Sequence, residues 1–160
     1  MVIRQAKKED IGQISDLEQK LLDYHKQFDE PLYATSIESR SSFSNWLSKR
    51  IEDENFISFV FTVNNKIFGY ITGWIDERPP IYEIRKFGYL SNIFVDEKYR
   101  SGTDAAKDLA YCLFDWFKQK GIKYVKTSCD ERNNTGLKFF YGLQFKDYSK
   151  TMLKILGEEE

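Results

Sequence analysis

The chain has few of the side chains that bind metal ions or form covalent crosslinks. Its 160 residues include two cysteines, Cys112 and Cys129, and one histidine, His25. Two cysteines are too few for a disulfide framework, and with one histidine they are too few for the four ligands of a structural zinc site. We therefore expect two reduced thiols packed as small apolar side chains, and no bound metal.

The sequence also lacks a long apolar run and an excess of charge of one sign. No segment approaches the ~20 apolar residues of a membrane-spanning helix, and the first residues, MVIRQAKKED, lack the apolar core of a secretory signal. The formal net charge is -1, so no overall field attracts nucleic acid or an anionic membrane. These absences predict a cytoplasmic protein whose partners are neither nucleic acids nor membranes.

What the sequence does contain is sufficient for a folded domain with a sizeable core. It is 41% hydrophobic and 31% charged, which is typical of a globular rather than a disordered chain. Aromatic residues make up 16%, which favours a phenylalanine-rich core, with an aromatic-lined pocket as the alternative. The length predicts one domain over residues 1–156, followed by a frayed acidic tail, GEEE, at 157–160.

Hydrophobic periodicity predicts helices and strands along the whole chain. Apolar residues at three- to four-residue spacing indicate helices, whereas short runs of β-branched and aromatic residues between turn residues indicate strands. The expected helices cover about 10–24, 43–51, 105–120 and 133–143, and the expected strands cover 1–6, 56–63, 66–75, 88–95 and 122–129. Residues 145–156 are expected to form a last strand or a pair of strands. Asn64 and Asn65 suit a two-residue hairpin turn, and Gly121 suits a helix C-cap.

A turn of small and polar residues joins the strand at 88–95 to the next helix. It consists of Arg100, Ser101, Gly102, Thr103, Asp104 and Ala105. The first turn of a helix leaves N–H groups unpaired and carries about half a positive charge, so it suits a phosphate. Arg100 would add a charge-assisted contact. The alternative is an ordinary helix start, with Ser101 or Thr103 as the N-cap and Asp104 as a first-turn acid.

Four segments in order make the chain resemble the GCN5-related N-acetyltransferase (GNAT) family. They are the opening VIRQAKKEDIGQISDL, the hairpin NNKIFGYITGWI, the strand and turn LSNIFV and RSGTDA, and the pair YVKTSC and NNTGLKFFYGLQF. The turn is similar to the family pattern R/Q-x-x-G-x-G/A. It departs from that pattern because Thr103 replaces the middle glycine, Gly102 stands one place early and Asp104 occupies a position that is usually apolar. Downstream, Gln144 stands where a glycine is common.

The resemblance implies an α/β fold of the α+β type. It has a single mixed, mostly antiparallel sheet with central splayed parallel strands, flanked by helices on both faces. The family binds acetyl-CoA, its co-substrate, in the gap between the splayed strands, here LSNIFV and KYVKTSC. The resemblance assigns the pantetheine arm to the backbone of Phe94 and Val95, and the pyrophosphate to Arg100 and the amides of Ser101 through Ala105. Asn134 would contact the pantetheine arm or, alternatively, cap the helix, a role that Asn133 can also fill.

The resemblance also suggests catalytic residues. Tyr141 matches the family tyrosine that gives a proton to the leaving CoA sulfur, with a packed structural tyrosine as the alternative. Ser91 and Asn92 stand where several family members carry a carboxylate base, and neither is a base at neutral pH. Glu83 is the nearest candidate for the base. The other candidates are Asp76, Glu77 and His25. The alternative interpretation is that Asp76 and Glu77 are solvated surface charges and that His25 is a surface histidine.

These features together predict an N-acetyltransferase that moves an acetyl group from acetyl-CoA to a primary amine by direct attack. The alternative is a catalytically silent module of the same fold that binds CoA or a protein partner. The acceptor would be a small-molecule or peptide amine, and acidic residues in the expected acceptor region would favour a cationic one. Those residues are Asp23, Asp29, Glu30, Asp76, Glu77 and Glu83. Dimerisation through the last strands is common in such folds, so a homodimer is a further expectation.

Overall fold

The sheet of this protein has five strands in sequence order. The structure is a computed structural model that describes residues 1–156, so the expected tail at 157–160 lies outside the described residues. The strands are β1 (Val2–Gln5), β2 (Phe56–Val63), β3 (Lys66–Glu77), β4 (Lys86–Val95) and β5 (Val125–Lys126). Neighbours from β1 to β4 are antiparallel, and β4 and β5 are parallel. This confirms the mixed, mostly antiparallel sheet.

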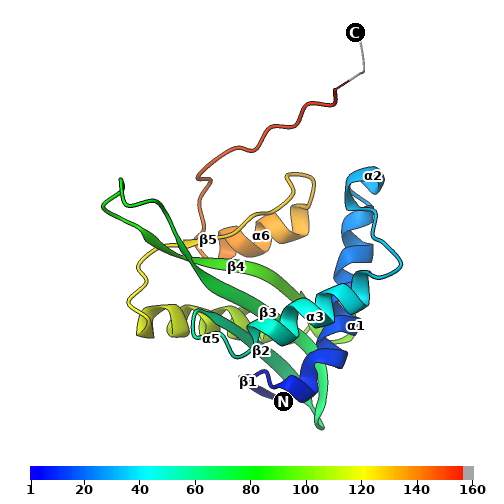
Figure 1. Cartoon of the computed structure of the whole chain (residues 1–160). Coiled ribbons are helices and arrows are strands. Elements are labelled where there is room, and N and C mark those ends of the chain that lie inside the picture. Colours follow the sequence, from blue (N-terminus) through cyan, green and yellow to red (C-terminus); the bar gives the residue numbers. More distant parts are fainter. Residues whose placement is uncertain (157–160) are drawn as a thin grey trace.

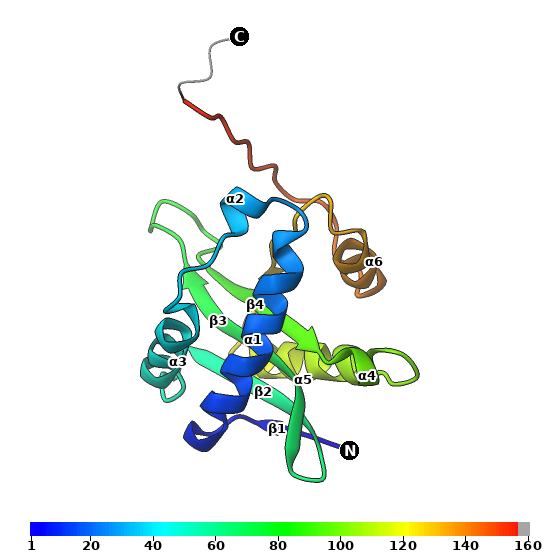
Figure 2. The same ribbon diagram turned by 90° about the vertical axis from the view of Figure 1, so that its right-hand side faces the viewer.

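Helices cover both faces of the sheet (Figures 1 and 2). They are α1 (Ile11–Lys26), preceded by the 3-10 turn η1 (Lys8–Asp10), α2 (Glu30–Tyr33), α3 (Ser39–Arg50), α4 (Glu97–Arg100), α5 (Ala105–Gln119) and α6 (Asn134–Gly142). The single-turn helices α2 and α4 were not expected. Each begins at an aspartate whose side chain accepts a backbone hydrogen bond, Asp29 from Leu32 and Asp96 from Lys98, which stabilises one isolated turn.

Each face of the sheet has its own apolar core, because successive side chains of a strand point to opposite sides. On β2, Val60 packs in the cluster beneath α1 and α3, while the adjacent Phe61 packs in the cluster beneath α5 and α6. Helix α1 contributes Ile14 and Leu17 to the first cluster, and α5 contributes Leu113 to the second. The sheet that carries the candidate residues of β4 is therefore packed on both sides.

Turn residues behave as the sequence predicts. Asn64 and Asn65 have φ angles of 48° and 62°, the left-handed values that a tight hairpin between β2 and β3 requires. Gly121 follows the C-cap of α5 with a φ of 73°. Asn133, one of two expected N-caps of α6, accepts a hydrogen bond from the Gly136 amide at 2.9 Å. Both cysteines are free thiols, as expected.

The expected strand at 145–156 does not form, and the prediction there is wrong. Residues 146–156 are extended, exposed and unpaired within the described chain, and they run away from the body of the molecule (Figure 1). A strand requires a neighbouring strand to satisfy its peptide groups. The nearest candidate, expected over 122–129, is reduced to the two residues of β5. The apolar pattern of the segment is thus present without a partner in this chain.

Two glycines distinguish a packed position from an open one. A Cβ atom on Gly88, in β4, would lie 2.8 Å from ring carbons of Phe117, whereas a Cβ on Gly142, in α6, would meet nothing within 4 Å. We expect Gly88→Ala to lower the free energy of unfolding by about 1–3 kcal/mol, because the buried ring must move. Gly142→Ala, the control, should be neutral or raise it by up to about 1 kcal/mol. Urea denaturation measures both, and equal midpoints would show that the α5–β4 contact is looser than described.

Candidate active site

The sheet opens between β4 and β5 soon after the two strands meet. They pair only through Gly88 with Val125 and Tyr89 with Lys126. Beyond Tyr89, β4 continues to Val95 with no described strand on that side. This divergence confirms the splayed parallel strands, and it leaves peptide groups of β4 free on one edge.

The direction of these peptide groups follows from one hydrogen bond beyond the strand. The Asp96 amide donates to the Phe68 carbonyl of β3 at 2.7 Å. Peptide groups along a strand alternate in direction, so those of Phe94 also turn toward β3. Those of Ile93 and Val95 therefore face the open edge. The sequence resemblance assigned the pantetheine arm to Phe94 and Val95 but not to Ile93. Which peptide groups face the open edge depends on a β-bulge that the sequence does not reveal.

That bulge lies at Ser91 and Asn92. Ile93 pairs with Ile71 and Leu90 with Gly73, so two residues of β4 oppose the single residue Thr72. The bulge brings the two consecutive side chains into contact, since the Ser91 hydroxyl donates to Asn92 Oδ1 at 2.8 Å. Both residues are partly exposed, as is the following Ile93, whereas Leu90 before them is buried.

A buried carboxylate lies directly behind the bulge. Glu18 of α1 is 4% exposed, and its two oxygens accept hydrogen bonds from Asn92 Nδ2 at 2.9 and 2.8 Å. It also accepts one from the hydroxyl of Tyr70, a fully buried residue of β3. Burial raises the pKa of Glu18 above its usual value, against the effect of these two donors. Burial and the nearby Glu18 charge raise the pKa of Tyr70. No sequence pattern singled out Glu18, which occupies an ordinary position on an amphipathic helix.

The turn before α5 is ordered by its own side chains. The Arg100 guanidinium donates to the Val95 carbonyl at 3.3 and 3.1 Å and lies 5.4 Å from the centre of the Phe94 ring. Thr103 Oγ1 donates to the Tyr99 carbonyl at 2.5 Å and accepts from the Ala105 amide at 3.4 Å. Thr103 therefore contacts the first amide of α5 from the position before the N-cap. The expectation of Ser101 or Thr103 as the N-cap is wrong, and the first-turn acid of α5 is Asp108 rather than Asp104.

The remaining turn residues leave the start of α5 accessible. Gly102 has a φ of 84°, a left-handed value that favours glycine. Asp104 is the N-cap residue, but its side chain makes no capping hydrogen bond, and both Asp104 and Ser101 are exposed. Residues of this turn line a hollow of about 400 Å³ against β1. Its lining includes Gly102, Thr103, Asp104, Ala105 and Asp108.

Across the open edge lie the end of β5 and helix α6. Thr127, just after β5, carries a buried hydroxyl oxygen with no hydrogen-bond partner among the described residues. Asn134 is the first residue of α6 and is exposed, while the cap itself is Asn133. An unpaired buried oxygen beside an open strand edge fits a site that takes a polar ligand.

Tyr141 and Glu83, the two catalytic residues expected from the sequence, lie on different parts of the molecule. Tyr141 of α6 is 49% exposed, and its hydroxyl donates to Asp147 at 2.9 Å, a contact that raises the pKa of the phenol. Glu83 lies in the exposed loop between β3 and β4. From the start of β4 at Lys86 to the bulge at Ser91 is a strand length of roughly 16 Å.

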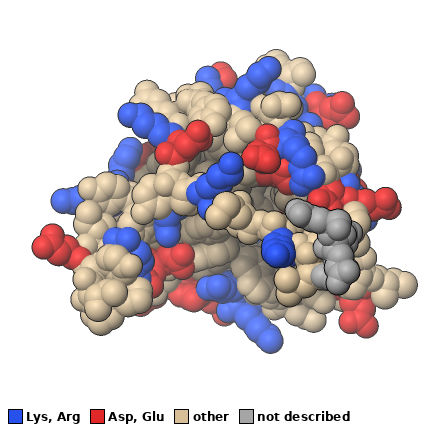
Figure 3. Space-filling view, turned by 90° about the horizontal axis from the view of Figure 1, so that it is seen from above, with Lys and Arg blue, Asp and Glu red and all other residues tan. Residues whose placement is uncertain are grey.

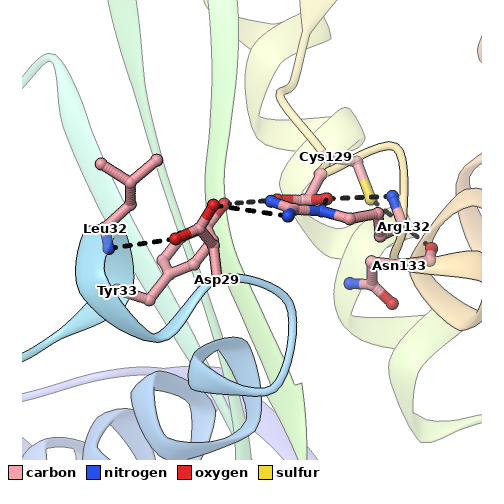
Figure 4. Close-up of polar contacts among 7 residues, drawn as sticks. Asp29, Leu32, Tyr33, Cys129, Arg132 and Asn133 are labelled. Atoms are coloured by element: carbon pink, nitrogen blue, oxygen red, sulfur yellow. Dashed lines mark hydrogen bonds and ion pairs between the residues drawn. The ribbon is translucent and has the colours of Figure 1, made fainter. Parts of the chain in front are cut away.

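An ion-pair cluster joins α2 to the loop before α6 (Figure 4). Arg132 contacts Asp130 at 2.8 Å and Asp29 at 3.4 Å, and Tyr33 donates to Asp130 at 3.0 Å. Hydrogen bonds from Arg132 are the main reason that the pKa of Asp130 lies far below its usual range. Asp29, expected to attract a cationic acceptor, is therefore partly neutralised by Arg132. The adjacent His25 is half-buried, and burial lowers its pKa.

The charges on the face seen from above are mixed in sign. Figure 3 shows lysine and arginine side chains interspersed with aspartate and glutamate, without a broad field of either sign. Within residues 1–156, no group of three or more His, Cys, Asp and Glu side chains is placed to hold a metal ion. In the same part of the chain, no helix has both the length and the apolar character that crossing a membrane demands.

An open strand edge beside the N-terminus of a long helix is the arrangement expected of a CoA-dependent acyltransferase of this fold. Residues 16–145 match the model of the acetyltransferase (GNAT) family. The chain therefore belongs to the GNAT family of acetyltransferases, as the sequence resemblance suggested. A comparison with curated proteins finds no match.

Solved structures support the same fold. A tetramutant of the BH1408 protein from Bacillus halodurans is 19% identical with a TM-score of 0.86, covering 98% of this chain and 100% of that chain. Aminoglycoside N-acetyltransferase AAC(6')-Iy in complex with CoA is 16% identical with a TM-score of 0.74, covering 98% and 94%. A predicted acetyltransferase from Clostridium acetobutylicum, solved with acetyl-CoA, is 16% identical with a TM-score of 0.75, covering 97% and 96%. At these identities the similarity concerns the fold.

Proposed function

We propose that this protein transfers an acetyl group from acetyl-CoA to a primary amine by direct attack on the thioester. The observation that carries the proposal is the open edge of β4, which presents unpaired peptide groups next to the start of α5. The family of the chain supplies the class of reaction. Structural neighbours that were solved with CoA or acetyl-CoA support the choice of co-substrate.

In this proposal the pantetheine arm of acetyl-CoA lies along β4 and completes the sheet. The peptide groups of Ile93 and Val95 would bind it, with Phe94 holding the strand against β3. Arg100 already contacts the Val95 carbonyl, so binding requires its guanidinium to exchange that contact for a phosphate oxygen, a stronger acceptor. On the β5 side, the exposed Asn134 and the unpaired hydroxyl oxygen of Thr127 are further candidates to contact the arm.

The pyrophosphate would bind at the start of α5, on the amides of Ser101, Gly102, Thr103, Asp104 and Ala105. The Ala105 amide would then exchange its contact with Thr103 Oγ1 for a phosphate oxygen. Helix α5 runs from Ala105 to Gln119, long enough to develop the full partial charge at its N-terminus. Asp104 is the one unfavourable group, because a carboxylate repels a phosphate. Its side chain is exposed and makes no capping hydrogen bond, so it can turn into solvent without breaking an interaction within the described residues.

The reaction needs three proton and charge movements. The amine nitrogen attacks the thioester carbonyl carbon, the C–S bond breaks, and the thiolate takes a proton, which we assign to Tyr141. A backbone N–H at the open edge of β4 would stabilise the oxyanion. The attacking nitrogen loses a proton to a base, for which Glu83 stays our candidate, although its exposed loop must then approach the bulge.

The acceptor would be a small-molecule or peptide amine. Several structural neighbours are named aminoglycoside N-acetyltransferases, which makes aminoglycosides a reasonable first class to test. The second candidate function is a silent module that binds CoA or a partner protein without acetyl transfer. The observations that favour it are Asp104 within the turn and the absence of a carboxylate at Ser91 and Asn92.

Thermal unfolding with acetyl-CoA separates binding from its absence. At about 100 times the dissociation constant, acetyl-CoA should stabilise the folded protein by roughly 2.7 kcal/mol and raise the midpoint accordingly. Asp104→Asn should bind equally well or up to about tenfold more tightly, since a repulsive charge is removed. Asp108→Asn, one turn along α5, is the matched control. No midpoint shift in the wild type at millimolar acetyl-CoA would refute the transferase proposal.

Replacing the proposed acid tests catalysis separately from binding. Tyr141→Phe should lower kcat by about 10²- to 10⁴-fold with kanamycin, spermidine or a lysine-containing peptide as acceptor, while acetyl-CoA affinity changes little. The matched control is Tyr148→Phe, an exposed tyrosine of the extended segment. Release of free CoA thiol measures the rate. Turnover equal to wild type in Tyr141→Phe would remove this residue from the mechanism.

We further propose that the protein forms a homodimer through the extended segment at 146–156. That segment carries large apolar side chains that are at least 61% exposed, namely Tyr148, Met152, Leu153, Ile155 and Leu156. The outer edge of β5 has no described strand beside it. A segment with strand-like composition and a free sheet edge in the same chain complement one another between two copies.

Mass determination in solution tests this dimer. The full chain should have twice the monomer mass at about 50 μM, whereas a chain ending at Phe145 should be monomeric, because the pairing segment is gone. Ile155→Lys, which places a charge within the apolar part of the segment, should weaken the dimer, while Lys150→Ala should not. A monomeric full chain at this concentration would contradict the proposal.

A further inference from the structure

The proposed reaction assigns no role to Glu18, a buried carboxylate that contacts Asn92 of β4. Glu18 belongs to α1, Tyr70 to β3 and Asn92 to β4, so three elements meet at one side chain. A carboxylate that is 4% exposed is costly unless its charge is compensated by donors. Such a cost at the rim of a candidate site calls for a functional reason.

The contacts of Glu18 fit its ionised form. Its Oε2 accepts from Tyr70 and Asn92 together, and its Oε1 accepts from Asn92. Tyr70 and Asn92 donate to these oxygens through three contacts, which compensate the charge of the carboxylate. An ionised Glu18 therefore places a negative charge next to the side-chain amide of Asn92.

This charge determines which way the Asn92 amide faces. Asn92 Nδ2 must point to the carboxylate, because its carbonyl oxygen would be repelled there. Asn92 Oδ1 consequently points toward Ser91, whose hydroxyl donates to it at 2.8 Å. An amide oxygen has two lone pairs, so one remains for a further donor, and the lone pairs of the Ser91 hydroxyl remain as well. Both residues are partly exposed at the open edge.

We propose that Asn92 Oδ1 and Ser91 Oγ together bind the N–H groups of the acceptor's primary amine, and that Glu18 is the positioning residue that holds Asn92 in the required orientation. Two acceptors suit two N–H hydrogens and leave the nitrogen lone pair free to point along the open edge of β4. The oxygens of an amide and a hydroxyl accept hydrogen bonds from an amine as those of a carboxylate do. Ser91 and Asn92 could therefore bind the amine at a position where other family members carry a carboxylate. The inference rests on the proposed function for the role of that amine, but amine binding can be measured without acetyl transfer.

Nuclear magnetic resonance of the side-chain amide of Asn92 gives a direct readout. Titration of the full-length protein with n-propylammonium chloride should shift the Asn92 side-chain signals and the Ser91 backbone amide in a saturable manner. Tetramethylammonium chloride, a cation without N–H groups, should not shift them. Absence of a shift with propylammonium up to about 0.1 M, or an equal shift with both salts, would overturn the proposal, since a charge alone would then account for the response.

Variants separate positioning from a purely structural role. Glu18→Gln should weaken propylammonium binding by about tenfold or more, because a neutral amide no longer fixes the orientation of Asn92. Asp10→Asn is the matched control, since Asp10 is 6% exposed and pairs with Arg4 away from the bulge. It should lose stability without changing amine affinity. If Glu18→Gln does not fold, Ser91→Ala, at a partly exposed position, should still weaken binding by several-fold, and unchanged affinity in either Glu18→Gln or Ser91→Ala would overturn the proposal.

Acetyl-CoA binding distinguishes the failure of this inference from that of the proposed function. Propylammonium shifts at Asn92 without any midpoint shift from acetyl-CoA would retain the amine site and refute the transferase. A midpoint shift from acetyl-CoA without amine-induced shifts at Asn92 would retain the transferase and refute this site. With a turned-over acceptor such as spermidine, Glu18→Gln should raise KM far more than it lowers kcat.

Discussion

The site depends on one constraint of the sheet, which is that β5 leaves β4 after only two residue pairs. A strand in the middle of a sheet has all its peptide groups satisfied, so it offers nothing to a ligand. By diverging early, β5 frees the edge of β4 from Leu90 onward while α5 and α1 keep both faces of the strand packed. The result is an unpaired edge within a rigid core, which an extended polar molecule can complete as a further strand would.

The bulge at Ser91 and Asn92 gives this edge its chemistry. One extra residue reverses the direction of the peptide groups that follow, so Ile93 and Val95 rather than Phe94 face the gap. The same extra residue brings a hydroxyl and an amide side by side in front of the buried carboxylate of Glu18. In the proposed mechanism, the groups that would bind the two substrates lie within a few residues of one another, which a direct transfer between bound substrates requires.

The extended segment at 146–156 and the outer edge of β5 each lack a strand partner within the described chain. The apolar residues of the segment suit a strand, and the free edge of β5 suits a partner, yet the described chain does not join them. Short β5 is a consequence of the same divergence that opens the site, because β5 has only β4 to pair with. An intermolecular strand would lengthen β5 and reinforce the wall of the gap opposite β4.

Local sequence signals determined the elements and the family. Asn64–Asn65, Gly121 and Asn133 act through their own backbone or side chain within a few residues, and the turn RSGTDA with its neighbours carried the GNAT resemblance. The bulge, the burial of Glu18 and the missing strand at 145–156 were decided only in three dimensions. A bulge depends on the register between two strands, and Glu18 is buried only because Tyr70 and Asn92, 52 and 74 residues away, supply its donors. A strand forms only where another strand is free to pair, and no segment's own residues contain that information.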